Sequence, residues 1–163
     1  MAEASYYTSA LASVAGASKR HLAIFNASGS GKVLKVYRIR ASGAPTAAVT
    51  GLVIPLIAVR ITTAPTGGGA GTINKADTAE AAPPAQVTVM TAATGGATEE
   101  ANAFGVATVT GEETQGASSA TLYDAVIDGL KPLVCAEGQG ILVKQGALAS
   151  AGAVNIVAWF SLL

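Results

Sequence analysis

Several residue types on which protein chemistry commonly depends are scarce in this chain. Its 163 residues include one Cys and one His, which excludes a disulfide framework within the chain and leaves few side chains for catalysis. Charged residues make up 12% of the sequence, against roughly 25% in a typical domain, and aromatic residues make up 5%. So few charged residues favour a surface that neighbouring subunits cover. The alternative is a solvent-exposed surface made of uncharged Ala, Thr and Ser.

Long apolar runs and long basic runs are missing as well. No segment approaches the ~20 apolar residues of a membrane-spanning helix, and residues 1–14 lack the basic region and apolar core of a signal peptide. The net charge is zero and no long run of Lys and Arg occurs, which argues against broad contact with nucleic acid. We expect a protein without membrane or nucleic-acid partners that is made and kept in a cytoplasm.

No motif in the sequence supports catalysis. The segment Asn26–Val33 has Gly and Lys near the positions of a phosphate-binding loop, but Asn26 and Val33 stand where that motif needs Gly and Ser or Thr. A Ser nucleophile needs a nearby base, and His21 is the only His. Cys135 lies in an apolar run that favours a buried, unreactive thiol. We therefore expect no enzymatic activity and no cofactor.

What the sequence does contain is a β pattern with turn residues between short apolar segments. Strands without helices between them favour an all-β fold, an antiparallel β-sandwich with a jelly-roll-like arrangement. Segment 64–84 is predicted to be a long exposed loop, and segment 121–130 one or two helical turns closed by Gly129. The first two strands are predicted to form a hairpin or to lie side by side. The predicted strands are 21–26, 32–41, 52–63, 86–91, 103–110, 132–136, 140–144 and 153–161.

Residues 1–20 are small and polar and are predicted to form an extended N-terminal arm, with a single β-sandwich domain at 21–163. Tyr6, Tyr7 and Leu11 are the arm's candidates for contact with a neighbouring subunit. An arm of this kind could be deleted and still leave a folded domain.

The charges are divided along the chain. Residues 1–75 hold eight Lys or Arg and one Glu, whereas residues 76–163 hold two Lys and nine Asp or Glu. This division gives copies of the chain a means of joining by opposite charge. We therefore expect self-association.

One predicted strand carries a basic stripe of Lys35, Arg38 and Arg40, and Arg60 would extend it if the strands 32–41 and 52–63 pair. We interpret the stripe as a surface for another subunit or a shell, with an ordinary solvent face as the alternative. The expected acidic partners of this stripe lie in loop-like sequence. The alternatives are that their carboxylates are simply solvated or that they bind calcium. These partners are Glu99, Glu100, Glu112 and Glu113.

Two segments resemble a known class of protein. In Arg20–Arg40 an apolar strand ends in Phe25-Asn26 and leads through a Gly/Ser turn into a basic strand. This segment resembles one found in small structural proteins of tailed bacteriophages, and segment 140–159 is similar to their closing strands. The resemblance implies a virion component on the capsid surface, made in the host cytoplasm. It further implies a decoration or cement protein that sits as a homotrimer on the major capsid protein.

The alternative from another class is a head-fibre or tail-tip β-sandwich that binds a receptor or glycan. Such sites usually present clustered aromatic side chains. In this sequence the large aromatic residues are scattered, which favours the decoration hypothesis. They are Tyr6, Tyr7, Tyr37, Tyr123 and Trp159.

Overall fold

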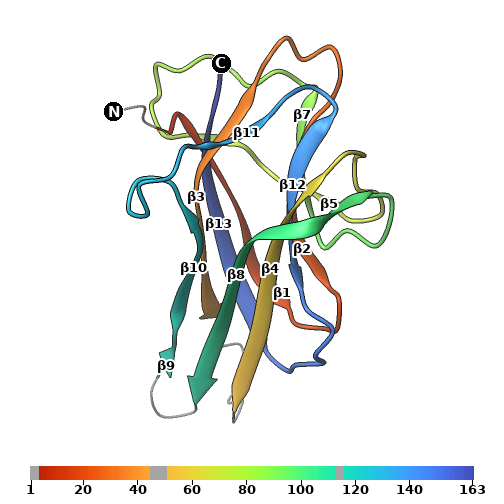
Figure 1. Cartoon of the computed structure of the whole chain (residues 1–163), viewed down its shortest axis with the longest axis vertical. Helices are drawn as coiled ribbons and strands as arrows, with labels where there is room; N and C mark the ends of the chain where they lie inside the picture. Colours follow the sequence, from red (N-terminus) through yellow and green to blue (C-terminus); the bar gives the residue numbers. More distant parts are fainter. Residues whose placement is uncertain (1–3, 45–50, 113–115) are drawn as a thin grey trace.

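The computed structural model describes residues 4–44, 51–112 and 116–163 (Figure 1). Within these ranges the chain forms thirteen strands and no helix. The strands make two antiparallel sheets that pack face to face around a common core, which confirms the predicted β-sandwich. No helix in the described ranges is long and apolar enough to cross a membrane.

The six-stranded sheet has the order β10-β3-β13-β1-β6, and β11 pairs with one end of β3. Its last strand in the sequence, β13, lies between β3 and β1, so the two ends of the described chain are neighbours in one sheet. Its strands are β1 (Tyr6–Val14), β3 (Leu34–Ala44), β6 (Asn74–Lys75), β10 (Ser119–Asp124), β11 (Leu133–Cys135) and β13 (Ala153–Leu162).

The seven-stranded sheet has the order β5-β7-β2-β12-β4-β8-β9. Its central strands are rich in Val, Ile, Leu and Ala, as expected for strands buried on both faces. Its strands are β2 (Arg20–Asn26), β4 (Leu52–Ile61), β5 (Gly69–Ala70), β7 (Val87–Thr91), β8 (Glu99–Glu112), β9 (Gly116–Ala117) and β12 (Gln139–Gln145).

The first four strands alternate between the sheets, since β1 and β3 belong to one sheet and β2 and β4 to the other. The prediction that strands 21–26 and 32–41 form a hairpin or lie side by side in one sheet is therefore wrong. The Asn26 carboxamide donates a hydrogen bond to the Lys32 carbonyl at 2.8 Å, and Gly29 and Gly31 adopt positive φ of 82° and 64°. This turn carries the chain from one sheet to the other instead of folding it back.

The N-terminal segment is not an extended arm, because residues 6–14 form β1 inside the six-stranded sheet. Tyr6 is 2% exposed, stacks on Phe160 with ring centroids 5.7 Å apart, and donates a hydrogen bond to the Ala81 carbonyl. The side chains of Tyr6, Thr8 and Ala10 point into the core, and the residues between them point outward. This alternation is that of a β-strand with one buried face, although the segment is largely polar. The predicted separation of an arm from the sandwich is wrong for these residues.

A second apolar cluster lies on the outer face of the seven-stranded sheet. Leu142 sits between Ile141 and Val143, which face the main core, so its side chain points the other way. Ala97, from the segment between β7 and β8, packs against this cluster. Backbone hydrogen bonds join that segment to residues 62–66, so part of the predicted exposed loop is tied down over the sheet. The cluster comprises Ala23, Phe25, Val59, Ile61 and Leu142.

The predicted helical turns at 121–130 are wrong over their first half, because Ser119–Asp124 is strand β10. A single turn follows, in which the Asp128 amide donates to the Asp124 carbonyl, and Gly129 ends it with a φ of 64°. Pairing of β10 with β3 overrides the local preference of this segment for helix.

Candidate interaction surface

On the outer side of the six-stranded sheet four side chains form a row across the strands. Tyr7 on β1 pairs with Trp159 on β13, Trp159 pairs with Arg38 on β3, and Arg38 pairs with Asp124 on β10. Residues directly opposite one another on adjacent strands present their side chains on the same face. The register thus brings together Tyr7 and Trp159, which lie near opposite ends of the sequence.

Other predicted interface residues lie on the same outer face. Arg40, whose side chain is 46% exposed, shares the face with Arg38, as the sequence predicts. Leu11 is 70% exposed on β1, and Lys35 pairs with Ser161 at the other end of the sheet. The outer face therefore combines cations, aromatic rings and an exposed Leu, which is a composition typical of protein-binding surfaces.

Asp124 is a buried carboxylate beneath the two arginines. Its Oδ2 accepts a hydrogen bond from Arg38 Nε at 2.6 Å and lies 3.8 Å from Arg40 Nη2. Burial alone would raise the pKa of Asp124, but hydrogen bonds from Ile127, Arg38 and Val126 outweigh it and hold the pKa below its usual value. Asp124 thus fixes Arg38, whereas Arg40 stays more exposed.

Residues 125–131, between β10 and β11, form an apolar loop. Val126, Ile127 and Leu130 are 59%, 68% and 53% exposed. Asp124 Oδ1 accepts hydrogen bonds from the Val126 and Ile127 amides, each at 3.1 Å, and the Tyr123 hydroxyl donates to the Lys131 carbonyl. The loop is therefore held in one shape while it presents three large apolar side chains to solvent.

Arg60 does not join the basic stripe. It lies on β4 in the seven-stranded sheet, so strands 32–41 and 52–63 do not pair and the condition for Arg60 to extend the stripe is not met. Its Nη1 donates to the Val134 carbonyl at 2.5 Å and lies 3.7 Å from Cys135 Sγ, which ties β4 to β11 across the sandwich. Burial raises the pKa of the Cys135 thiol to about 11, against a smaller opposing effect of Arg60.

The predicted acidic partners that the structure describes belong to β8, in the seven-stranded sheet. Glu99 on β8 pairs with Arg20 at 3.0 Å and with Lys144. Burial would raise the pKa of Glu99, but the hydrogen bonds from Lys144 and Arg20 lower it. Glu100 is exposed on β8, Glu112 ends that strand, and Glu113 lies outside the described residues.

The turn that has some features of a phosphate-binding loop holds a carboxylate of the chain itself. Glu137 accepts hydrogen bonds from the Gly31 amide at 2.6 Å and the Gly29 amide at 3.1 Å. These backbone hydrogen bonds, first that from Gly29, lower the pKa of Glu137. The anion-binding amides of this turn are thus occupied from within the protein.

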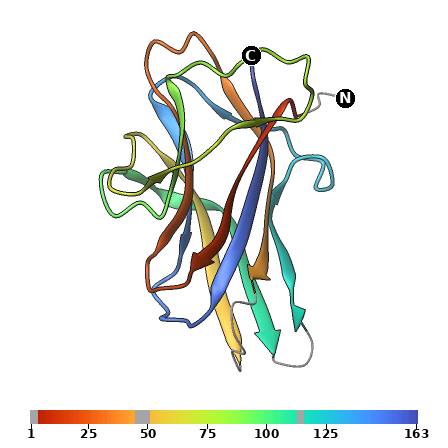
Figure 2. The ribbon, with the colours of Figure 1, turned by 180° about the vertical axis from the view of Figure 1, so that it is seen from behind.

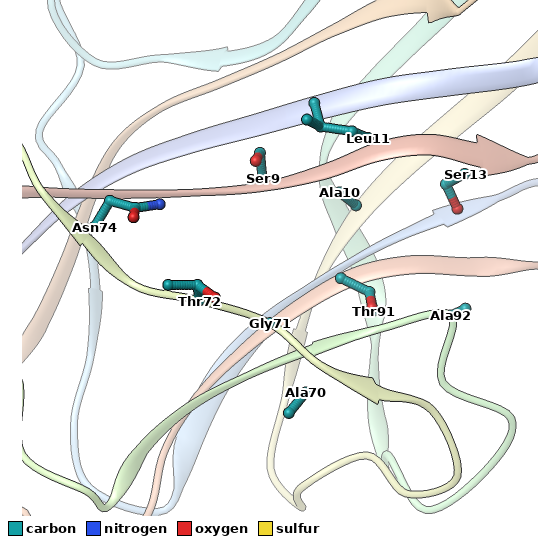
Figure 3. A pocket seen from close by; sticks show the side chains of 10 residues that line it. All are labelled: Ser9, Ala10, Leu11, Ser13, Ala70, Gly71, Thr72, Asn74, Thr91 and Ala92. Atoms are coloured by element: carbon teal, nitrogen blue, oxygen red, sulfur yellow. The ribbon is translucent and has the colours of Figure 1, made fainter.

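A groove of about 390 Å³ lies between β1 and residues 70–74 (Figure 3). Strand β6 pairs only with Tyr6 and Tyr7, so within the described chain the edge of β1 from Thr8 onward has no strand beside it. Ala10 and Ser13 point toward the groove, and Leu11 points to the opposite side of the ribbon. The lining also includes Ser9, Ala70, Gly71, Thr72, Asn74, Thr91 and Ala92.

Sequence reasoning placed Tyr7, Leu11, Lys35, Arg38 and Arg40 on an interface, and the structure gathers these five on one face. It missed Trp159 and Asp124, because their positions follow from long-range pairing of β13 and β10 with β3. The one local signal for the apolar loop is its run of Val126, Ile127 and Leu130 beside an Asp and a Gly.

Among the described residues no group of three His, Cys, Asp or Glu side chains is placed to hold a metal ion. Comparison with known proteins finds no matching family model, no matching curated protein and no matching solved structure.

Proposed function

We propose that the protein is a capsid decoration (cement) protein of a tailed bacteriophage. In this proposal it is non-catalytic, self-associates as a homotrimer and binds the major capsid protein on the outside of the virion. The sequence resemblance in segments 20–40 and 140–159 motivates the proposal.

The observation that carries the proposal is the strand order. The order β1-β13-β3-β10 faces the order β2-β12-β4-β8, and the chain passes from sheet to sheet between them. The proposal takes this interleaving as a jelly roll, with β5, β6 and β7 inserted between β4 and β8. Jelly rolls build many viral capsid and lectin domains, so the support is an analogy of fold.

The outer face supports a role in binding rather than catalysis. It carries cations and aromatic rings, and the His21 ring is fully buried away from it. A face with Arg38 and Arg40 suits an acidic, polar partner surface, where charge sets specificity and the rate of association.

The first test is the copy number of this protein in purified particles from its source, measured by quantitative mass spectrometry against the major capsid protein. A simple ratio to the major capsid protein is the expected result. Absence from particles would overturn the proposal, and a handful of copies would favour a tail or fibre location.

A second test measures attachment to capsids that lack the protein. Arg40→Glu should weaken co-sedimentation with those capsids, because it reverses the exposed charge of the outer face. Lys32→Glu is the matched control, since Lys32 is exposed in the turn before β3 and outside the outer face. Equal loss in both variants would show that the outer face is not the attachment surface.

A second candidate function is a head-fibre or tail-tip module that binds a glycan or receptor. The pairing of Tyr7 with Trp159 favours it, because aromatic side chains that are distant in the sequence are adjacent on the surface. Trp159 is the only Trp, so its fluorescence reports this face directly. Saturable quenching by host cell-surface polysaccharide, lost in Tyr7→Ala, would favour this function; an unchanged signal would count against it.

A further inference from the structure

Two features of opposite shape lie on opposite sides of the molecule. The apolar loop, residues 125–131, leaves the β10 edge of the six-stranded sheet, and the groove follows the β1 edge on the other side. Figure 2 shows the loop to the right of the sandwich, while strand β1 runs from the upper right to the lower left. A copy placed beside the first would therefore bring one feature near the other.

The apolar loop has the properties of an interface anchor. Val126, Ile127 and Leu130 are each more than half exposed, which is costly in water unless a partner covers them. The hydrogen bonds of Asp124 and Tyr123 already order the loop in the free protein. Binding to a partner therefore does not include the entropy cost of ordering the loop. Anchors of this rigid, apolar kind dominate the energy of many interfaces.

The groove has the properties of a receiving site. Its lining is mostly small residues, such as Ala10, Ala70 and Gly71, which leave room for larger side chains. One wall is the edge of β1 beyond Tyr7 on the side away from β13, which has no neighbouring strand in the described chain. An edge of this kind is normally covered by another segment of protein.

Each feature has exposed charges of both signs near it. Asp128 and Lys131 are exposed in the apolar loop, and Lys75 and Asp77 are exposed shortly after Asn74 of the groove. Opposite charges are thus available on both sides of a contact between copies, where they favour the correct pairing.

We propose that the apolar loop of one copy inserts into the groove of a second copy. The contact is head-to-tail, since different surfaces of the two copies meet, and repetition of such a contact closes into a ring when its rotation allows. This inference rests on the self-association in the proposed function and assigns the surfaces that carry it. It does not depend on a capsid.

Site-directed cross-linking of the full chain tests the contact. Ile127→Cys places a thiol on the apolar loop and Ala70→Cys places one in the groove; both positions are exposed. A mixture of the two variants under mild oxidation should give a disulfide-linked heterodimer, whereas each variant alone should give little. The control is Ile127→Cys mixed with Val106→Cys, since Val106 is 69% exposed on β8 in the other sheet.

The chain that carries both Ile127→Cys and Ala70→Cys should give a covalent ladder that ends at a closed ring. In sedimentation experiments, Ile127→Asp should weaken self-association by about tenfold or more, while Val106→Asp should leave it unchanged. Circular dichroism confirms that each variant is folded.

The outcomes separate this inference from the proposed function. Self-association without the mixed cross-link, or with efficient cross-linking of the Ile127→Cys variant to itself, would overturn the head-to-tail contact and leave self-association standing. A monomer at all concentrations would overturn both the contact and self-association. Capsid attachment, measured separately, would then decide whether the decoration role survives.

Discussion

The Asp124 carboxylate accepts a hydrogen bond from Arg38 Nε at 2.6 Å, and this contact joins the outer face to the apolar loop. Asp124 Oδ2 holds the arginine, while Oδ1 holds the amides of Val126 and Ile127. One buried side chain thereby fixes the position of a cation and the shape of the apolar loop.

Asp124→Asn should lower the free energy of unfolding by about 1–3 kcal/mol, because it removes the charge from buried hydrogen bonds with Arg38 and the loop amides. Asp128→Asn is the matched control in the same loop; it changes an exposed residue and should cost less than about 0.5 kcal/mol. Urea unfolding measures both. Equal effects would contradict the role assigned to Asp124.

Stability should fall as the pH is lowered, through His21. This ring is fully buried, Nδ1 shares a hydrogen bond with Ser13 Oγ at 2.8 Å, and Nε2 has no partner among the described residues. Burial, with a smaller effect of Lys19, lowers the pKa of His21 from 6.5 to about 4. Below pH 6.5 His21 therefore becomes protonated in the unfolded chain, whereas in the folded chain it stays neutral until about pH 4.

The free energy of unfolding should accordingly drop by about 3 kcal/mol between about pH 6.5 and pH 4, with little further change from this group below pH 4. Chemical denaturation at a series of pH values measures the slope. In His21→Gln the slope between about pH 6.5 and pH 5.5 should disappear, whatever the stability of the variant at pH 7, while the carboxylates with lowered pKa, Glu99 and Asp124, still contribute at lower pH. A wild-type protein that is equally stable at both ends of the range would disprove the prediction.

Two adjacent tyrosines test whether β1 is part of the fold. Tyr6→Ala should cost about 3–5 kcal/mol, because it removes a buried ring that stacks on Phe160. Tyr7→Ala is the matched control, since Tyr7 is 36% exposed on the outer face, and should cost less than about 1 kcal/mol. Thermal or urea unfolding separates them, and a small effect of both would restore the interpretation of residues 1–20 as an arm.

Gly140 on β12 is required by close approach of the backbone. A Cβ at this position would lie 2.2 Å from the Ile24 carbonyl oxygen and 2.9 Å from Phe25 Cα. Gly140→Ala should therefore destabilise the fold by about 1–3 kcal/mol or more. Gly146→Ala should be tolerated, because its nearest contact is Pro55 Cγ at 3.5 Å. Similar unfolding midpoints for the two variants would show that the strands can separate at Gly140 without cost.

Much of the fold could be predicted from the sequence because apolar alternation is a local signal. The strand at 52–63 corresponds to β4, the strand at 153–161 to β13, and both patterns report burial on one or two faces. The pairing of strands is not a local property. Neighbours in the sequence suggested that β2 and β3 pair, but the turn at 26–32 sends them to different sheets.

The candidate surface could be predicted from the sequence only where it depends on one strand alone. Arg38 and Arg40 share a face whatever their neighbours are, since they are two residues apart on one strand. Their partner Asp124 and their neighbour Trp159 depend on the placement of β10 and β13 beside β3. The N-terminal strand was missed because its inward residues include Thr8 and Ala10, which carry little apolar signal.

The central position of β13 in its sheet has a consequence for synthesis. Until β13 has left the ribosome, β1 and β3 have no strand between them, and both present open edges. A ribosome-bound chain that stalls before residue 153 therefore cannot complete either edge and would be prone to pair with other nascent chains. The six-stranded sheet can therefore close only after its C-terminal strand is available.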